Sequence, residues 1–263
     1  MFKAVTGARA PLGGAGHEWI EKFIIWAYNN GHTKSWAQGH LTAVAYFCKL
    51  REGRDPTKAH HLRAAMKGWG CLQARPRDQR RPLDLTKLRA VLRALRKLCP
   101  SGFERALFQA AFALAFYGAY RISELVAPSR RNPGQACLRA EDVSLGANLI
   151  EVFLRRSKTD QEGKGLTTII KGGPDHRCCA VQLLQRYLSV RPDRSGPLFI
   201  HGDGSYRSKF QFRAVFRAAL HHAGFPAHQY GSHSFRIGAA TTAAGLGLSE
   251  RVIKGIGRWR SKA

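Results

Sequence analysis

The 263-residue chain carries 43 Lys and Arg side chains against 17 Asp and Glu, a formal net charge of +26. Positive charge on this scale attracts polyanions, so nucleic acid is the expected partner and an anionic membrane surface is the alternative. No signal peptide and no segment apolar enough to span a bilayer is found, which predicts an intracellular protein without a membrane segment. The six cysteines form no C-x-x-C pair and are interpreted as thiols in a reducing compartment.

Short helices are predicted over residues 17–73, after a segment (1–16) that is expected to be flexible. Apolar side chains recur at helical spacing in HEWIEKFIIWAYNN, in SWAQGHLTAVAYFCKLREG and in the stretch that begins at Pro56. Trp26, Trp36 and Trp69 lie at core spacing, which favours packing over base stacking. This part is interpreted as a small helical domain with basic outer faces.

A linker is predicted at residues 74–82, ARPRDQRRP, because prolines and charges replace the apolar periodicity there. Residues 83–263 are predicted to be mostly helical, starting with the amphipathic LDLTKLRAVLRALRKL and the very apolar FERALFQAAFALAFYGAY. NLIEVFLRR and LTTIIK are rich in β-formers and flank a turn that contains glycines, which predicts a β-hairpin. Helices are expected again in QLLQRYLSV and KFQFRAVFRAALHHAGF.

Basic and aromatic residues suited to a phosphate occur at four places in this second part. Taken singly, each has an ordinary explanation: a surface ion pair, a solvated turn lysine, a helical His–Arg pair or a core tryptophan. Their order along the chain is more informative than any one of them. The residues are Arg121 with Glu124 three positions later, Lys158 in the hairpin turn, His233 with Arg236, and Trp259.

This order resembles the tyrosine recombinase (phage integrase-like) family. In that family an Arg follows a glycine turn, a Lys lies in a β-hairpin, an H-x-x-R pair opens a later helix, and a His or Trp follows a glycine near the nucleophilic Tyr. The segments GAYRISEL, RRSKTD, HSFR and GRW match these four motifs and occur in the same order along the chain. The version ending in G-R-W looks most like recombinases of eukaryotic mobile elements, which would place the protein in a nucleus if its source is eukaryotic.

The resemblance implies a fold that is mainly α with a small antiparallel β-sheet. Residues 17–73 would form the helical core-binding (DNA-binding) domain, and residues 83–263 the catalytic domain, C-terminally incomplete. The partner would be double-stranded DNA, and the family works as synaptic tetramers, so a homo-oligomer on DNA is expected. The activity implied is site-specific recombination or integration, in which DNA is broken and rejoined through a 3′-phosphotyrosyl intermediate.

The resemblance also assigns roles to the matching residues. Arg121 and Arg236 would clamp the scissile phosphate through their forked donors. Lys158, or Lys164 in the same hairpin, would protonate the departing 5′ hydroxyl. No cofactor is implied, because arginines supply the charge that Mg²⁺ supplies in other phosphoryl transfers. The supporting contacts to phosphoryl oxygens and to the cluster would come from His233, Trp259 and Glu124.

The nucleophilic tyrosine is the departure from the family pattern. All seven tyrosines precede Trp259, and four residues follow it. None of the seven is assigned as the nucleophile, so no strand cleavage in cis is expected. The intact upstream motifs favour a chain that stops short of its Tyr; the alternative is a catalytically dead, domesticated DNA-binding protein that keeps the fold.

Metal binding is the remaining signal to weigh. His60 and His61, and His221 and His222 with His228, lack the spacing of a structural zinc site. These histidines are therefore interpreted as basic or DNA-facing residues, and no metal ligand is predicted.

Overall fold

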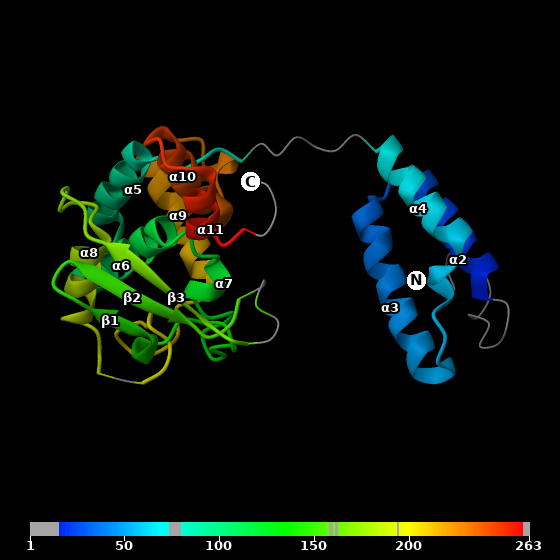
Figure 1. Cartoon of the computed structure of the whole chain (residues 1–263), viewed down its shortest axis with the longest axis horizontal. Helices are drawn as coiled ribbons and strands as arrows, with labels where there is room; N and C mark the ends of the chain where they lie inside the picture. Colours follow the sequence, from blue (N-terminus) through cyan, green and yellow to red (C-terminus); the bar gives the residue numbers. More distant parts are fainter. Residues whose placement is uncertain (1–15, 74–79, 158–159, 161–162, 194, 260–263) are drawn as a thin grey trace. The chain divides into compact units, whose positions relative to one another are not determined.

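The computed structural model describes residues 16–73, 80–157, 160, 163–193 and 195–259. The predicted flexible segment (except Gly16), most of the predicted linker and Lys158 therefore lie outside the described residues. The chain divides into two compact units, Met1–Asp78 (unit 1) and Gln79–Ala263 (unit 2), which are drawn in Figure 1. Among the described residues, no helix is long and apolar enough to cross a membrane.

The described residues of unit 1 form three α-helices around a small core. Thr33 caps the second helix by accepting a hydrogen bond from the Trp36 N–H, and Gly53 ends it in a left-handed conformation with φ of 68°. Trp69 is buried in this core, and Trp26 and Trp36 pack against it, as their spacing predicts. The elements are α2 (Gly16–Asn29), α3 (Lys34–Glu52), a 3₁₀ turn (Pro56–Lys58) and α4 (His60–Leu72).

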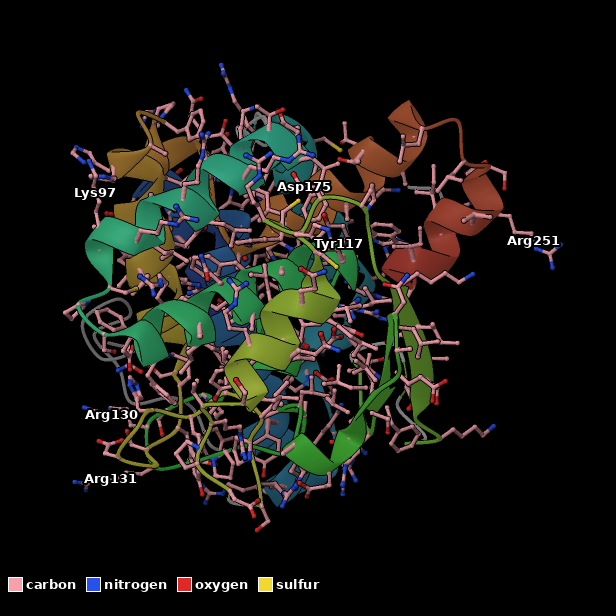
Figure 2. All side chains as sticks on the ribbon, turned by 90° about the vertical axis from the view of Figure 1, so that its left-hand side faces the viewer. Lys97, Tyr117, Arg130, Arg131, Asp175 and Arg251 are labelled. Carbon is pink, nitrogen blue, oxygen red and sulfur yellow. The ribbon has the colours of Figure 1, made fainter. Side chains whose placement is uncertain are left out.

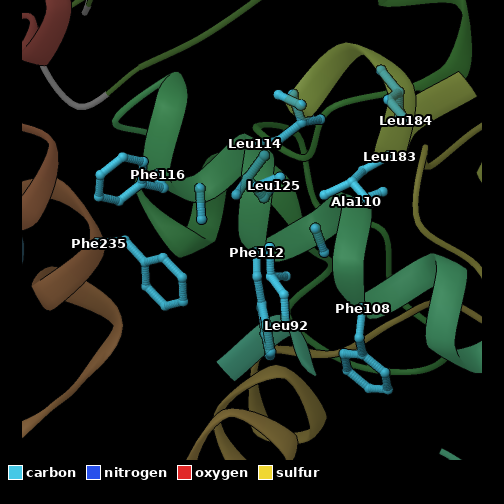
Figure 3. Close-up of a cluster of buried hydrophobic side chains, with 14 of the residues drawn as sticks. Leu92, Phe108, Ala110, Phe112, Leu114, Phe116, Leu125, Leu183, Leu184 and Phe235 are labelled. Atoms are coloured by element: carbon cyan, nitrogen blue, oxygen red, sulfur yellow. The ribbon is translucent and has the colours of Figure 1, made fainter. Parts of the chain in front are cut away.

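Unit 2 is organised around one buried helix, α6 (Gly102–Tyr117). Ser101 caps it, and every residue from Ala106 to Phe116 is buried. Figure 3 shows Phe112 of this helix beside Phe235 in the core. The other helices are α5 (Leu85–Leu98), α7 (Ile122–Leu125), α8 (Ala180–Leu188), α9 (Lys209–His222), α10 (Ser232–Gly245) and α11 (Glu250–Gly257), with 3₁₀ turns at Ala140–Asp142 and Ala227–Gln229.

A three-stranded antiparallel sheet completes unit 2, in the order β1 (Val143–Leu145), β2 (Leu149–Leu154) and β3 (Leu166–Lys171). Leu149 pairs with Lys171 and Leu154 with Leu166, so the predicted hairpin is confirmed. The sequence prediction missed β1, because this strand is three residues long and shows no buried alternation. The fold class is therefore confirmed: mainly helical, with a small antiparallel sheet.

Helix α10 is held against the start of unit 2 by a very close backbone approach. The Leu83 N–H donates to the Ser234 carbonyl at 3.0 Å, and Leu83 is fully buried. A Cβ atom added at Gly238 would overlap the backbone carbonyl of Leu83. Glycine is thus required at position 238, because any side chain would push α10 away from residue 83.

We expect Gly238→Ala to lower the free energy of unfolding of unit 2 by about 1–3 kcal/mol through overpacking. Gly245→Ala on the same helix is the matched control, because a Cβ there meets open space. This control should leave stability unchanged or raise it by up to about 1 kcal/mol. Urea unfolding measures both, and equal midpoints for the two variants would contradict the packing argument.

Candidate functional site

The candidate site is built on the C-terminal end of α6. The helix ends at Tyr117 with Gly118 as its C-cap, and Ala119 takes a left-handed backbone conformation with φ of 44°. The last carbonyls of a helix lack helical donors and carry the negative end of its dipole. Because α6 is buried, these carbonyls need partners from the protein, and cationic donors suit them best.

Two arginines from later in the chain supply those donors. The Arg236 guanidinium donates to the Ala119 carbonyl and, at 2.7 Å, to the Gly257 carbonyl. The Arg258 guanidinium donates to the Gly118 and Ala119 carbonyls at 3.0 and 3.2 Å. These bonds tie α10 and the end of α11 to the end of α6.

A single carboxylate joins Arg258 to Arg121. Glu124 accepts hydrogen bonds from the Arg121 backbone N–H at 2.8 Å and from the Arg121 guanidinium at 2.9 Å. It also accepts one from the Arg258 guanidinium at 3.0 Å. The Glu124 side chain is only 2% exposed, so its two ion pairs replace the water it has lost.

Each residue of the Gly-Arg-Trp segment (257–259) suits its position for a different physical reason. A Cβ on Gly257 would overlap the Trp259 ring. Arg258 adopts a left-handed conformation with φ of 54°, and its guanidinium lies 4.9 Å from the centre of the Tyr120 ring. The half-buried Trp259 has its ring 5.0 Å from the Arg236 guanidinium, a distance at which a cation–π attraction acts.

The resulting cluster has an excess of positive charge. Arg121, Arg236 and Arg258 bring three guanidiniums against the one carboxylate of Glu124. Burial lowers the pKa of Arg236 to about 10, and the charges of Arg121 and Arg258 add to this shift. A bound anion would relieve that repulsion. Arg121, whose side chain is 19% exposed, is the member of the cluster open to such an anion.

The structure brings together four of the residues singled out from the sequence, Arg121, Glu124, Arg236 and Trp259. His233 is exposed. It lines a hollow of about 240 Å³ at the N-terminal end of α10, together with Arg80, Arg213 and Arg217. Lys158 lies outside those residues. Lys164 is exposed in the hairpin turn, where its N–H donates to Asp160 at 3.2 Å.

Arg258 is the member of the cluster that the sequence reading missed. Its position between Gly257 and Trp259 was the available signal, but 43 basic residues give many equivalent candidates. Burial of its side chain to 5% exposed distinguishes it, and burial is a tertiary property. Arg258 positions Glu124 and the α6 carbonyls, and through Glu124 it positions Arg121.

Part of the sequence and the overall fold are similar to known proteins. No protein-family model matches the chain. Over 137 residues it is 31% identical to an integrase/recombinase XerD homolog of Selenomonas ruminantium, covering 50% of this chain and 37% of that relative. The chain thus spans well under half the length of that curated relative.

Solved structures match nearly the whole chain. XerH site-specific recombinase bound to difH substrate gives a TM-score of 0.60 at 13% identity, covering 98% of this chain and 69% of that one. The Tn1549 transposon integrase in complex with circular intermediate DNA gives a TM-score of 0.58 at 14% identity, covering 98% of this chain and 83% of that one. A lambda integrase dimer bound to a core site gives 0.57 at 13%, covering 94% and 62%.

The chain has the tyrosine recombinase fold. The sequence match to the XerD homolog agrees with this, so the resemblance predicted from the motif order is confirmed. Within this fold, the arginine cluster lies where three segments distant in sequence meet: the turn after α6, the second turn of α10 and the residues after α11 (Figure 1).

A tyrosine recombinase needs a nucleophilic tyrosine, but the hydroxyls of Tyr120, which lies against Arg258, and of Tyr117 at the end of α6 are already engaged. Tyr120 is buried and its hydroxyl bonds to that of Thr168. Tyr117 contacts the Cys178 sulfur at 3.5 Å. Burial raises the pKa of Tyr120 to about 12 and also raises that of Tyr117. A nucleophilic phenol needs the opposite shift, so both are structural residues.

Metal ligands were not predicted from the sequence. The described residues contain no group of three or more His, Cys, Asp or Glu side chains that could hold a metal ion. In the site, the positive charge is supplied by guanidiniums held on α6 carbonyls and Glu124.

We expect Glu124→Gln to lower the free energy of unfolding by about 3–5 kcal/mol, because it leaves buried guanidiniums without their counter-charge. The matched control is Glu250→Gln on α11, where Glu250 is 64% exposed and pairs with Lys254 at 2.8 Å. Loss of that surface pair should change stability by less than about 1 kcal/mol. Comparable losses in chemical denaturation of the two variants would show that Glu124 does not hold the cluster.

The buried phenols make stability depend on alkaline pH. Burial raises the pKa of Tyr120 and of Tyr187 from 10.0 to about 12. The stabilisation linked to these groups is complete below pH 10 and is lost as the pH rises through about 12, because the unfolded chain releases the protons earlier. We expect the free energy of unfolding to fall across this window, and more gently in Tyr120→Phe/Tyr187→Phe. An unchanged slope in the double variant, measured by urea unfolding at stepped pH, would contradict it.

Proposed function

We propose that the chain is the DNA-binding and phosphate-holding part of a site-specific tyrosine recombinase or integrase, which breaks and rejoins double-stranded DNA through a 3′-phosphotyrosyl intermediate. The observation that supports this most is the cluster of three guanidiniums against one carboxylate at the end of α6. Such a cluster suits one phosphodiester, whose charge grows as the transition state forms. The net charge of +26 suits a polyanionic partner.

The chemistry follows from which donors remain open. Arg121 presents a partly exposed guanidinium and would bind a non-bridging oxygen of the scissile phosphate, with the buried Arg236 supplying further charge. Glu124 and Arg258 would keep Arg121 oriented rather than react. The Trp259 indole N–H would donate to a further phosphoryl oxygen.

The leaving 5′ oxygen needs a proton, and the hairpin turn between β2 and β3 is the proposed source. Lys158 is the first choice for this general acid and Lys164 the second. His233, at the start of α10, would assist at a phosphoryl oxygen. Its neighbours Arg213 and Arg217 make its surroundings attractive to phosphate.

The division of labour within the chain is also part of the proposal. Residues 17–73 would be the core-binding domain, residues 74–82 the linker and residues 83–263 the catalytic domain. The partner would be duplex DNA, with copies of the chain assembled as a synaptic tetramer. The protein would act inside the cell, in the nucleus if its source is eukaryotic.

A second candidate function is DNA binding without strand cleavage. It is favoured by one observation, that the hydroxyl of Tyr120, the tyrosine beside Arg258, is occupied by Thr168 and its pKa is raised. The two candidates differ in whether the pocket can move a phosphoryl group, so the test must not depend on a tyrosine of the chain.

Joining of a nicked duplex that carries a 3′-(4-nitrophenyl) phosphate beside a 5′ hydroxyl provides that test. The 5′ oxygen attacks phosphorus, the bond to the aryl oxygen breaks, the hydroxyl proton goes to solvent, and yellow 4-nitrophenolate is released. The aryl ester stands in for the phosphotyrosyl linkage. The duplex is first selected from a random library for tight binding to the chain.

We expect the 263-residue chain to join this substrate faster than the uncatalysed reaction, and Arg121→Gln to lose at least about 100-fold of the acceleration, as for removal of one transition-state donor. Arg131→Gln, an exposed arginine of unit 2, is the control and should retain it. Tight binding without any joining would support the DNA-binding alternative. Absence of DNA binding would contradict both candidates.

A further inference from the structure

A cationic groove lies on unit 2 away from the arginine cluster, between α5 and α8. Its main hollow measures about 520 Å³ and shares Arg93 and Arg96 with a second of about 330 Å³. It shares Arg177 with a third of about 500 Å³. Because neighbouring hollows share lining residues, they form one extended feature, the α5–α8 groove. Its basic residues are Arg89, Arg93, Arg96, Lys97, Arg177 and Arg186.

The sequence of α5 explains why these side chains converge. Leu88, Val91, Leu92 and Leu95 are buried and pack α5 on the core. The arginines at positions 89, 93 and 96 fall between them at spacings of four and three, so they share the outer face of the helix. Arg186 of α8 and Arg177, just before α8, line the same hollow from the other side.

Charge in the groove is nearly all of one sign. Among the described residues that line its three hollows, Asp175 is the only acid. It pairs with Arg89 at 2.7 Å and with Arg177 at 3.3 Å. Arg93, Arg96 and Arg186 are exposed. Side chains of like charge held together on a surface repel one another, and a polyanion lying along them would relieve that repulsion.

The groove faces a different side of unit 2 from the arginine cluster. Figure 1 shows α5 and α8 on the left of unit 2 and α7 and α11 toward its right. Figure 2 views the left side and shows Lys97 and Asp175 on it. A ligand in the groove is therefore separate from a phosphodiester held by Arg121.

We propose that the α5–α8 groove binds the sugar–phosphate backbone of a second DNA duplex. The extent of the groove favours a linear polyanion over a single phosphate group. From Arg89 to Lys97 the outer face of α5 covers about 12 Å, and roughly three to four phosphates of one strand occupy that length. The inference rests on the proposed DNA-binding function, and it adds a separate site through which one chain holds two duplexes.

A two-duplex retention assay tests this. The chain is loaded on an immobilised duplex, washed, and offered a labelled duplex of different sequence at several salt concentrations. The test variant is Arg93→Gln/Arg96→Gln. The control, Arg130→Gln/Arg131→Gln, removes the same charge from a loop at the lower left of Figure 2. Thermal unfolding of each variant checks that unit 2 is folded, and Arg186→Gln repeats the test from the α8 side.

We expect the groove variant to retain roughly ten-fold less labelled duplex, with the salt slope of retention lower by about two. Its affinity for the immobilised duplex should stay within about two-fold of native, and the control should match native in both measurements. Unchanged retention by the groove variant would overturn the proposal, because bridging would then come from paired copies of the chain or from other surfaces. An equal loss of affinity for the immobilised and the labelled duplex in the groove variant would overturn the proposal as well. Failure of the native chain to bind the first duplex would instead contradict the proposed function.

Discussion

Hydrogen bonds between guanidiniums and the carbonyls of the turn that follows α6 hold the candidate site together. Arg236 and Arg258 come from the far end of the sequence, and both donate to the carbonyl of Ala119. Like charges at this separation repel in a medium of low dielectric constant. The negative end of the α6 dipole and the Glu124 carboxylate offset that repulsion, so the cluster can exist before any phosphate arrives.

The position of that helix end depends on the packing of α6 along its whole length. Phe112 contacts aromatic rings of α9 and α10. The centre of its ring lies 4.9 Å from that of Phe212 and 5.6 Å from that of Phe235. Gly238 allows α10 to approach Leu83 closely, which sets where Arg236 enters the site. The aromatic core therefore positions the functional groups. Burying charges in this way costs solvation energy, and preorganised charge at the site is the corresponding functional gain.

Positive charge is distributed over unit 2 in three settings with different physical consequences. In the buried cluster, Arg236 has fixed partners and a lowered pKa. Around His233, Arg213 and Arg217 line an open hollow. In the α5–α8 groove, arginines such as Arg93 and Arg96 are exposed along one helix face. The first setting suits chemistry on one phosphate, whereas the exposed ones suit salt-dependent attraction of a polymer.

The sequence alone predicted the fold class and the hairpin, and it singled out Arg121, Glu124, Arg236 and Trp259 because each belongs to a motif with local spacing and the motifs occur in a set order. Tertiary structure decided what those residues contact. Arg258 became a member of the cluster only through burial, since in the sequence it is one of 43 basic residues. His233, three residues from Arg236, lines a hollow with Arg213 and Arg217. Helical spacing places two side chains on one face of a helix, but the packing of neighbouring elements determines what each side chain contacts.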